Sequence, residues 1–269
     1  MKSVDYGDFI LHQGDCLDVL RAMPDASVDS VVTDPPYGLA FMGKKWDYDV
    51  PSEAIWVETL RVLKPGGHLL AFAGTRTQHR MAVRIEDAGF EIRDMIAWVY
   101  GSGFPKSLDV SKALDAAAGA EREVIGVAGK SGSVRNSMAG DFAGGEYMAT
   151  APATAAAAAE WAGWGTALKP ALEPLTVARK PLIGTVAMNV LAHGTGGLNV
   201  DGCRVGDGVR YNAAAGNKAG GNSLNMSAVG MPQGAAGREA IGRWPANLIH
   251  DGSDEVLAGF PKSDSPWIG

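Results

Sequence analysis

Short apolar runs alternate with amphipathic stretches along the first 127 residues, and this alternation restricts the fold more than any other feature. Apolar residues recur at helical spacing in three stretches, 16–23, 53–63 and 75–88. Three runs have the apolar or β-branched composition of strands, 27–32, 68–73 and 90–99. Strands that alternate with helices predict an α/β fold with a Rossmann-like, doubly wound and mainly parallel sheet.

The composition changes after residue 127. Residues 128–170 are rich in glycine, alanine and serine and include five consecutive alanines, which predicts a long flexible insertion. Residues 171–269 contain a predicted strand at 173–179, predicted helices at 185–191 and 253–260, and a second glycine-rich stretch at 206–237. We therefore expect three parts, an α/β portion (1–127), the insertion (128–170) and the remainder (171–269).

The composition also excludes several classes of protein. Cys16 and Cys203 are too few for a disulfide framework, and no cysteine or histidine has metal-ligand spacing, so we expect no metal. No stretch approaches the roughly 20 apolar residues that cross a membrane. The first residues do not begin a signal peptide, which predicts a cytoplasmic protein. The net charge of −6 argues against a uniformly basic surface but is compatible with a local basic cleft.

Residues 33–38, Thr-Asp-Pro-Pro-Tyr-Gly, follow the predicted strand 27–32 directly. The carboxyl ends of parallel strands face the ligand crevice of an open sheet. Two consecutive prolines fix φ and remove two backbone donors. Asp34 offers a carboxylate and Pro35 a carbonyl, and this pair of acceptors matches the two N–H donors of an exocyclic amine. The ring of Tyr37 offers a flat face on which a planar base could stack.

This segment resembles motif IV of the S-adenosylmethionine-dependent amino-methyltransferases that modify adenine N6 or cytosine N4 in DNA. The resemblance implies that Asp34, Pro35 and Pro36 orient the target amine for direct methyl transfer. It also implies that Tyr37 stacks on a base flipped out of the duplex, because the amine of a paired base is out of reach. The methyl donor would be S-adenosylmethionine, and the partner double-stranded DNA.

The segment that begins Gly14-Asp15-Cys16 resembles motif III of the same enzymes. There the acid accepts a hydrogen bond from the adenine amino group of the cofactor, a role that falls on Asp15, with Cys16 offering its backbone N–H. Asp15 also fits an acidic N-cap for the helix that begins at Cys16. The two roles are compatible.

Residues 98–107 resemble the loop after the next strand in a phage and bacterial subgroup of these enzymes. The resemblance implies that Trp98 or Tyr100 lines the base pocket and that Lys106 lies near a phosphate. Core packing explains Trp98 equally well. Six other basic residues fit phosphate contacts or ordinary solvated charges about equally, namely Arg179, Lys180, Arg204, Arg210, Arg238 and Arg243.

A glycine-rich Phe-x-Gly-x-Gly cofactor loop, expected by the resemblance, is absent from the sequence. We therefore expect an incomplete methyltransferase fold with an exposed apolar sheet edge, completed by a C-terminal fragment or a second subunit. Adenine N6 is the favoured target, because many cytosine N4 enzymes have serine where Asp34 stands. Three alternatives remain open at this point: cytosine N4, a protein glutamine, and a truncated, non-catalytic DNA-binding remnant.

Overall fold

The computed structural model describes residues 2–40, 43–101, 103, 107–130, 134–137, 140–142, 146–151, 156–212 and 238–259. Its internal contacts divide the chain into two units. The first comprises Met1–Tyr100 and Leu172–Gly269, and the second comprises Gly101–Ala171. The three-part division at residues 127 and 170 stays a prediction.

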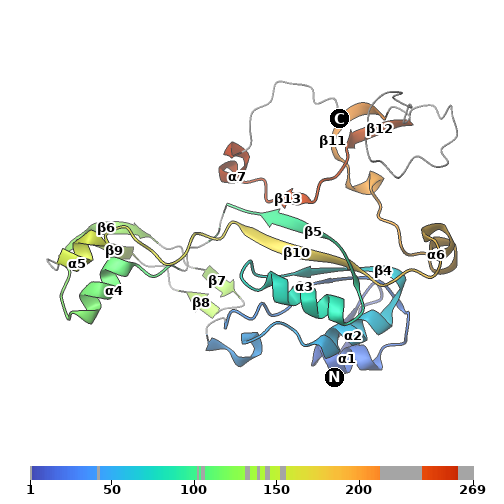
Figure 1. Cartoon of the computed structure of the whole chain (residues 1–269), viewed down its shortest axis with the longest axis horizontal. Helices are drawn as coiled ribbons and strands as arrows, with labels where there is room; N and C mark the ends of the chain where they lie inside the picture. The colour runs from blue at the N-terminus through green and yellow to red at the C-terminus, as the bar shows by residue number, and fades with distance from the viewer. Residues whose placement is uncertain are drawn as a thin grey trace, which may run out of the picture. The chain divides into compact units, whose positions relative to one another are not determined.

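A five-stranded sheet in the first unit has the order β13-β5-β10-β4-β3 (Figure 1). Its strands are β3 (Val28–Thr33), β4 (Leu63–Phe72), β5 (Glu91–Val99), β10 (Leu172–Arg179) and β13 (Leu248–His250). The pairs β3–β4 and β13–β5 are parallel, whereas β10 is antiparallel to both β4 and β5. Four of the five strands therefore point the same way, and the α/β class with a mainly parallel sheet is confirmed.

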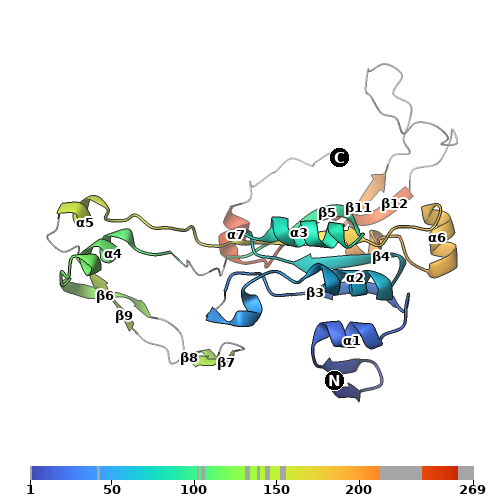
Figure 2. The ribbon, with the colours of Figure 1, turned by 60° about the horizontal axis from the view of Figure 1, so that its bottom comes forward.

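Two helices cover one face of this sheet, α2 (Glu53–Val62) over β4 and α3 (Gln78–Asp87) over β10 and β5 (Figures 1 and 2). The alternating residues Leu69 and Ala71 of β4 point into this layer and are fully buried. They belong to one apolar cluster with Trp56 of α2 and Met81 and Ile85 of α3. Alternate residues of β4 therefore pack against the apolar faces of α2 and α3. This close packing keeps the sheet rigid below its carboxyl edge.

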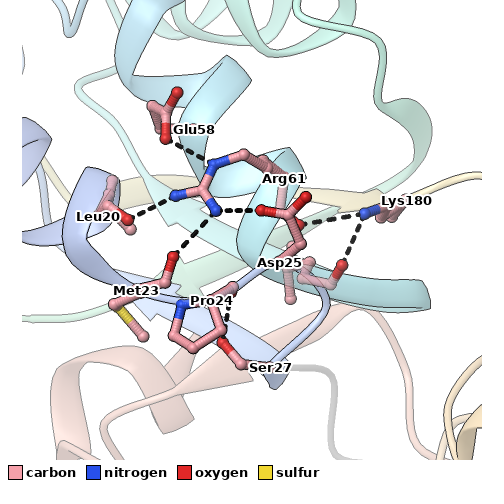
Figure 3. A network of polar contacts seen from close by, with 9 residues as sticks. Leu20, Met23, Pro24, Asp25, Ser27, Glu58, Arg61 and Lys180 are labelled. Carbon is pink, nitrogen blue, oxygen red and sulfur yellow. Dashed lines mark hydrogen bonds and ion pairs between the residues drawn. The ribbon is translucent and has the colours of Figure 1, made fainter.

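The N-terminal hairpin, β1 (Lys2–Asp5) and β2 (Ile10–Gln13), forms a separate two-stranded sheet and leads into α1 (Cys16–Ala22). Helix α1 packs on α2, and Arg61 of α2 joins the two (Figure 3). Its Nη2 donates to the carbonyl of Leu20 at 2.7 Å, and its Nη1 to the carbonyl of Met23 at 2.9 Å. Ion pairs with Asp25 and Glu58 hold the guanidinium in place, so this one side chain caps the last turn of α1.

Helix α6 (Val186–His193) is fixed to the amino end of β4 by a buried amide. Asn189 Nδ2 donates to the carbonyls of Pro65 and Thr195 at 2.9 and 2.8 Å. Its Oδ1 accepts from Ile183 N at 3.0 Å, so all three bonds of this fully buried side chain are internal. The unit also contains a 3-10 helix (Asp201–Cys203), the antiparallel pair β11 (Val205–Asn212) and β12 (Arg238–Arg243), and α7 (Asp254–Ala258).

The second unit contains two helices and four short strands. The helices are α4 (Val110–Ala117) and α5 (Ala156–Glu160), which contact each other. The strands form two antiparallel pairs, β6 (Val124–Lys130) with β9 (Glu146–Thr150) and β7 (Val134–Ser137) with β8 (Gly140–Phe142). Arg122 forms an ion pair with the buried Asp115, which ties the end of α4 to the strand that follows.

Strand β4 begins at Leu63, before the predicted run 68–73, and Gly66 within it adopts a φ of +78°. The pairs β6–β9 and β7–β8 lie in or next to residues 128–170, and the flexibility expected of that stretch stays a prediction. No helix in the described part of the chain has the length and apolarity needed to cross a membrane.

Candidate active site

The carboxyl edge of the sheet brings residues from four segments together. Asp34 follows β3, Gly74 follows β4, and Tyr100 follows β5. Glu173 lies at the start of β10, and because β10 is antiparallel, its start lies at this same edge. The amide of Ala73 donates to the carbonyl of Pro174 at 3.0 Å, so the end of β4 and the start of β10 are joined directly.

The predicted amine acceptors lie beyond the last residue of β3. The side chain of Asp34 is exposed, and Pro35 and Pro36 are half-buried. An exposed carboxylate next to a proline carbonyl can accept two N–H bonds from one planar group. The residues predicted for catalysis therefore lie where a substrate can reach them.

Tyr37 is held from two sides. Its hydroxyl donates to Glu173 Oε2 at 3.3 Å. A Cβ placed on Gly74 would lie 3.4 Å from Cδ2 of the Tyr37 ring, so the ring rests against a residue that has no side chain. Burial and the carboxylates of Asp34 and Glu173 raise the pKa of Tyr37 far above its ordinary value. The hydroxyl is therefore a hydrogen-bond donor throughout the physiological pH range.

Tyr100 and Trp98 lie on the neighbouring strand β5 and just beyond it. The hydroxyl of Tyr100 donates to Glu173 Oε1 at 3.4 Å, and burial with the charge of Glu173 raises its pKa. Trp98 is half-buried and is the direct cross-strand partner of Glu173. Directly paired residues point to the same face of a sheet, so Trp98 flanks the Glu173 carboxylate.

Asp47 fixes the loop that follows Tyr37. Its Oδ1 accepts from Gly38 N at 2.9 Å, and its Oδ2 accepts from Leu39 N at 3.2 Å. The side chain is 3% exposed and lies in a 3-10 helix (Lys45–Asp47). Gly38 has a φ of +69°, and a Cβ there would lie 3.0 Å from Val50 N, so the turn requires glycine.

Asp15 and Cys16 lie apart from the five-stranded sheet, between the N-terminal hairpin and α1. Asp15 Oδ1 accepts from Leu17 N at 2.9 Å, which confirms its expected N-cap role. Partial desolvation and the adjacent Asp15 carboxylate raise the pKa of the Cys16 thiol. Cys16 is therefore a neutral thiol at neutral pH and not a nucleophile. Lys106, expected near a phosphate, lies outside the described residues.

Three of the basic residues considered for phosphate contact are used inside the protein instead. Arg179 is 9% exposed and pairs with Glu91 at 2.6 Å. Lys180 Nζ donates to the Leu63 carbonyl at 2.7 Å (Figure 3). Arg204 pairs with Asp201 at 2.8 Å, and its guanidinium lies 5.3 Å from the ring centroid of Trp244. These internal partners favour a structural role for the three residues, and their contact with phosphate stays a prediction.

Sequence reasoning missed two residues of this region, Glu173 and Asp47. Tyr37 and Glu173 are 136 positions apart, so no local pattern could join them. The available signal was an acidic residue at the very start of an apolar strand, beside Pro174. Asp47 lies in a stretch without periodicity, where its only signal was a single acid after Trp46.

Parts of the chain are similar in sequence to known proteins. Residues 28–136 match the family model described as DNA methylase (N6_N4_Mtase). The match includes residues 34–38, which we call the acceptor loop. The type II methyltransferase M.BamHI of Bacillus amyloliquefaciens is 36% identical over 73 residues, which cover 23% of this chain and 16% of that protein. The type II methyltransferase M.HindIII of Haemophilus influenzae is 27% identical over 152 residues, covering 54% of this chain and 38% of that protein.

These matches show that residues 28–136 are similar to the N6/N4 DNA methyltransferase family. The chain spans well under half the length of both curated relatives. A solved DNA modification methylase of Thermus thermophilus is 20% identical, with a TM-score of 0.34 over 64% of this chain and 54% of that one. Likeness of this degree does not bear on function. Within the described residues, no cluster of three or more histidine, cysteine or acidic side chains could hold a metal ion.

Proposed function

We propose that this chain is the catalytic and target-recognition portion of a DNA methyltransferase that methylates the exocyclic amine of a flipped base, with adenine N6 as the favoured target. The observation that carries the proposal is the position of the exposed Asp34 carboxylate and the Pro35 carbonyl beside Tyr37, at the carboxyl edge of the sheet.

In this proposal the flipped base stacks on Tyr37 and donates its two amine N–H groups to Asp34 and Pro35. Both acceptors draw the amine hydrogens into one plane and leave the nitrogen lone pair directed out of it. S-adenosylmethionine, when bound, supplies an electrophilic methyl group. The nitrogen would take up this methyl group as the S–C bond breaks and its electron pair stays on the sulfur. The Asp34 carboxylate would stabilise the positive charge on the nitrogen, which then loses a proton to solvent.

The choice of adenine over cytosine rests on Asp34 alone, because many cytosine N4 enzymes have serine at this position. Cytosine N4 stays the nearest alternative, because the family that the acceptor loop resembles modifies either base. Digestion of methylated DNA to nucleosides distinguishes N6-methyldeoxyadenosine from N4-methyldeoxycytidine. The reaction requires access to cellular DNA, so a cytoplasmic location belongs to the same proposal.

The residues near Asp15 fit one end of the cofactor. Asp15 Oδ1 is used by the N-cap bond, and Oδ2 has no partner among the described residues, so it can accept from an adenine amino group. Asp15 and the Cys16 amide would hold that end. Burial of Asp34 and Tyr37 by the bound base would exclude water from the reacting nitrogen.

A second segment, supplied by a C-terminal fragment or another subunit, completes the cofactor site in this proposal. The sequence has no Phe-x-Gly-x-Gly loop, and β3 pairs only with β4 within the described residues. Val32 on this edge strand is 68% exposed, which is unusual for an apolar strand residue. We expect calorimetry to detect only weak S-adenosylmethionine binding by the 269-residue chain. Tight binding or robust turnover by this chain alone would show that no further segment is required.

The test of catalysis is Asp34→Ala. This variant should lose methyl transfer by roughly two or more orders of magnitude, because the amine loses the carboxylate that orients it and stabilises its charge, while DNA affinity changes little. Asp29→Ala in the preceding strand, β3, is the matched control, because the exposed Asp29 side chain forms an ion pair with Lys64. Equal methylation by Asp34→Ala and wild type would exclude the proposed role. DNA binding without methylation in any context would favour a non-catalytic DNA-binding protein.

A further inference from the structure

One carboxylate, that of Glu173, bridges two tyrosines that come from different strands. Oε2 accepts from the hydroxyl of Tyr37 at 3.3 Å, and Oε1 accepts from the hydroxyl of Tyr100 at 3.4 Å. All three side chains are half-buried. The bridge joins the loop after β3 to the loop after β5 across the start of β10.

The backbone under this carboxylate is rigid. Glu173 is the second residue of β10, which is paired on both sides, to β4 and to β5. The next residues, from Pro174 to Arg179, are all buried. Since an interior strand cannot shift without breaking both ladders, Glu173 presents its oxygens at a fixed place.

The Tyr37 ring, in contrast, is carried by a loop. Without Glu173, its hydroxyl would keep the hydrogen bond to Asp34 of the same loop, and its ring would keep the contact with Gly74, which has no side chain to hold it. A tyrosine side chain released from a partner can leave one staggered χ1 well for another. The ring can be pre-organised for stacking only if something outside the loop holds its far end, and Glu173 is the group that contacts that end.

We propose that Glu173 is a positioning residue of the base site, which holds the rings of Tyr37 and Tyr100 in place before DNA binds. Glu173 makes no contact with substrate in this scheme and acts through the two hydroxyls. The inference rests on the proposed function, because it gives Tyr37 the role of stacking on an unpaired base.

The test uses a short single-stranded oligonucleotide with one 2-aminopurine among thymidines, whose fluorescence falls when the base stacks on an aromatic ring. Saturating wild-type chain should quench the probe. Glu173→Met, which has no oxygen acceptor, and Tyr37→Phe should each lose roughly twofold of the quenching, because the ring then samples more than one staggered well. The double variant should lose no more than the larger single loss, since the bond between Tyr37 and Glu173 is common to both variants. Glu86→Met, at an exposed site on α3, should quench like the wild type.

A second route protects the test against misfolding. If Glu173→Met is unfolded by circular dichroism, the variant with both Tyr37→Phe and Tyr100→Phe keeps Glu173 and both rings but removes both bridging hydroxyls. It should show the same loss of quenching, and a wild-type level would overturn the inference.

The outcomes separate this inference from the proposed function. Full quenching by Glu173→Met, with quenching lost in Tyr37→Ala, would exclude the positioning role and leave the base site standing. Full quenching by Tyr37→Ala, or no quenching by the wild type, would contradict the base site itself and the positioning role with it. Additive losses in the double variant would also overturn the inference, because Glu173 would then act by another route.

Discussion

Asp47 anchors the backbone of the acceptor loop, whereas we proposed above that Glu173 holds the aromatic ring of that loop. Its buried carboxylate accepts from the amides of Gly38 and Leu39, the two residues after Tyr37. Asp47→Ala removes both acceptors and should lower the free energy of unfolding by about 1–3 kcal/mol. It should also impair methyl transfer, because the loop that presents Asp34 loses its anchor. Chemical denaturation of the purified variant measures the first effect.

The matched control for Asp47 is Asp29→Ala. The Asp29 side chain is 70% exposed, and its ion pair with Lys64 lies at the surface. Its loss should change the free energy of unfolding by less than about 1 kcal/mol. Similar losses in the two variants would mean that the Asp47 bonds contribute no more than a surface ion pair.

At the residue scale, the sequence predicted the acceptors but not their supports. Asp34, Pro35 and Tyr37 are consecutive or nearly so, and a strand before two prolines is a local signal. Glu173 contacts that loop from 136 positions away, and Asp47 contacts it from 9 positions away. Both contacts exist only after the sheet has formed. Arg179 shows the limit of local reasoning in another way, since this basic residue at the end of a predicted strand is a buried ion-pair partner.

Helix α6 is attached to the sheet through one polar side chain. Asn189 is fully buried and makes three hydrogen bonds, including one to Pro65 in β4. Asn189→Ala removes the side-chain partner of the Thr195 carbonyl and of the Ile183 amide, while the Pro65 carbonyl keeps the Thr195 hydroxyl, and it should cost about 2–4 kcal/mol of unfolding free energy. Asn199→Ala is the matched control, because the exposed Asn199 side chain makes one bond, to Gly202 N. Equal costs for the two variants, measured by denaturation, would contradict this account of the α6 anchor.

The sheet itself was predictable to the extent that its strands have local patterns. The runs that became β3, β4, β5 and β10 were each identified, because β-branched and apolar residues cluster there. The direction of β10 was not, since a period of two residues looks the same in either direction. Its antiparallel orientation is what brings Glu173, rather than Arg179, to the carboxyl edge.

At the scale of the whole molecule, the pH dependence of the free energy of unfolding should include a contribution from His68. This half-buried side chain in β4 pairs across the strand with Arg179, and burial together with the charges of Arg179 and Arg93 lowers its pKa. As the pH falls below the ordinary histidine value of 6.5, the unfolded chain takes up a proton that the folded protein resists, so the free energy of unfolding falls. The Glu91 carboxylate pairs with Arg179 and so offsets part of the positive charge near His68.

His68→Gln should flatten the pH dependence of unfolding between about pH 5 and 7, because glutamine takes up no proton. Denaturant titrations of wild type and variant at several pH values measure this slope. An unchanged slope would mean that His68 is protonated as easily in the folded protein as in the unfolded chain.

The central claim is that Asp34 in the acceptor loop supports methylation of an exocyclic amine in DNA, and one measurement tests it most directly. The gene is placed, with its neighbouring reading frames, in a bacterial host free of DNA methylation, and the host DNA is digested to nucleosides for mass spectrometry. We predict N6-methyldeoxyadenosine with the wild type and none with Asp34→Ala. Absence of any amine-methylated base with the wild type, or an undiminished amount with Asp34→Ala, would contradict the account.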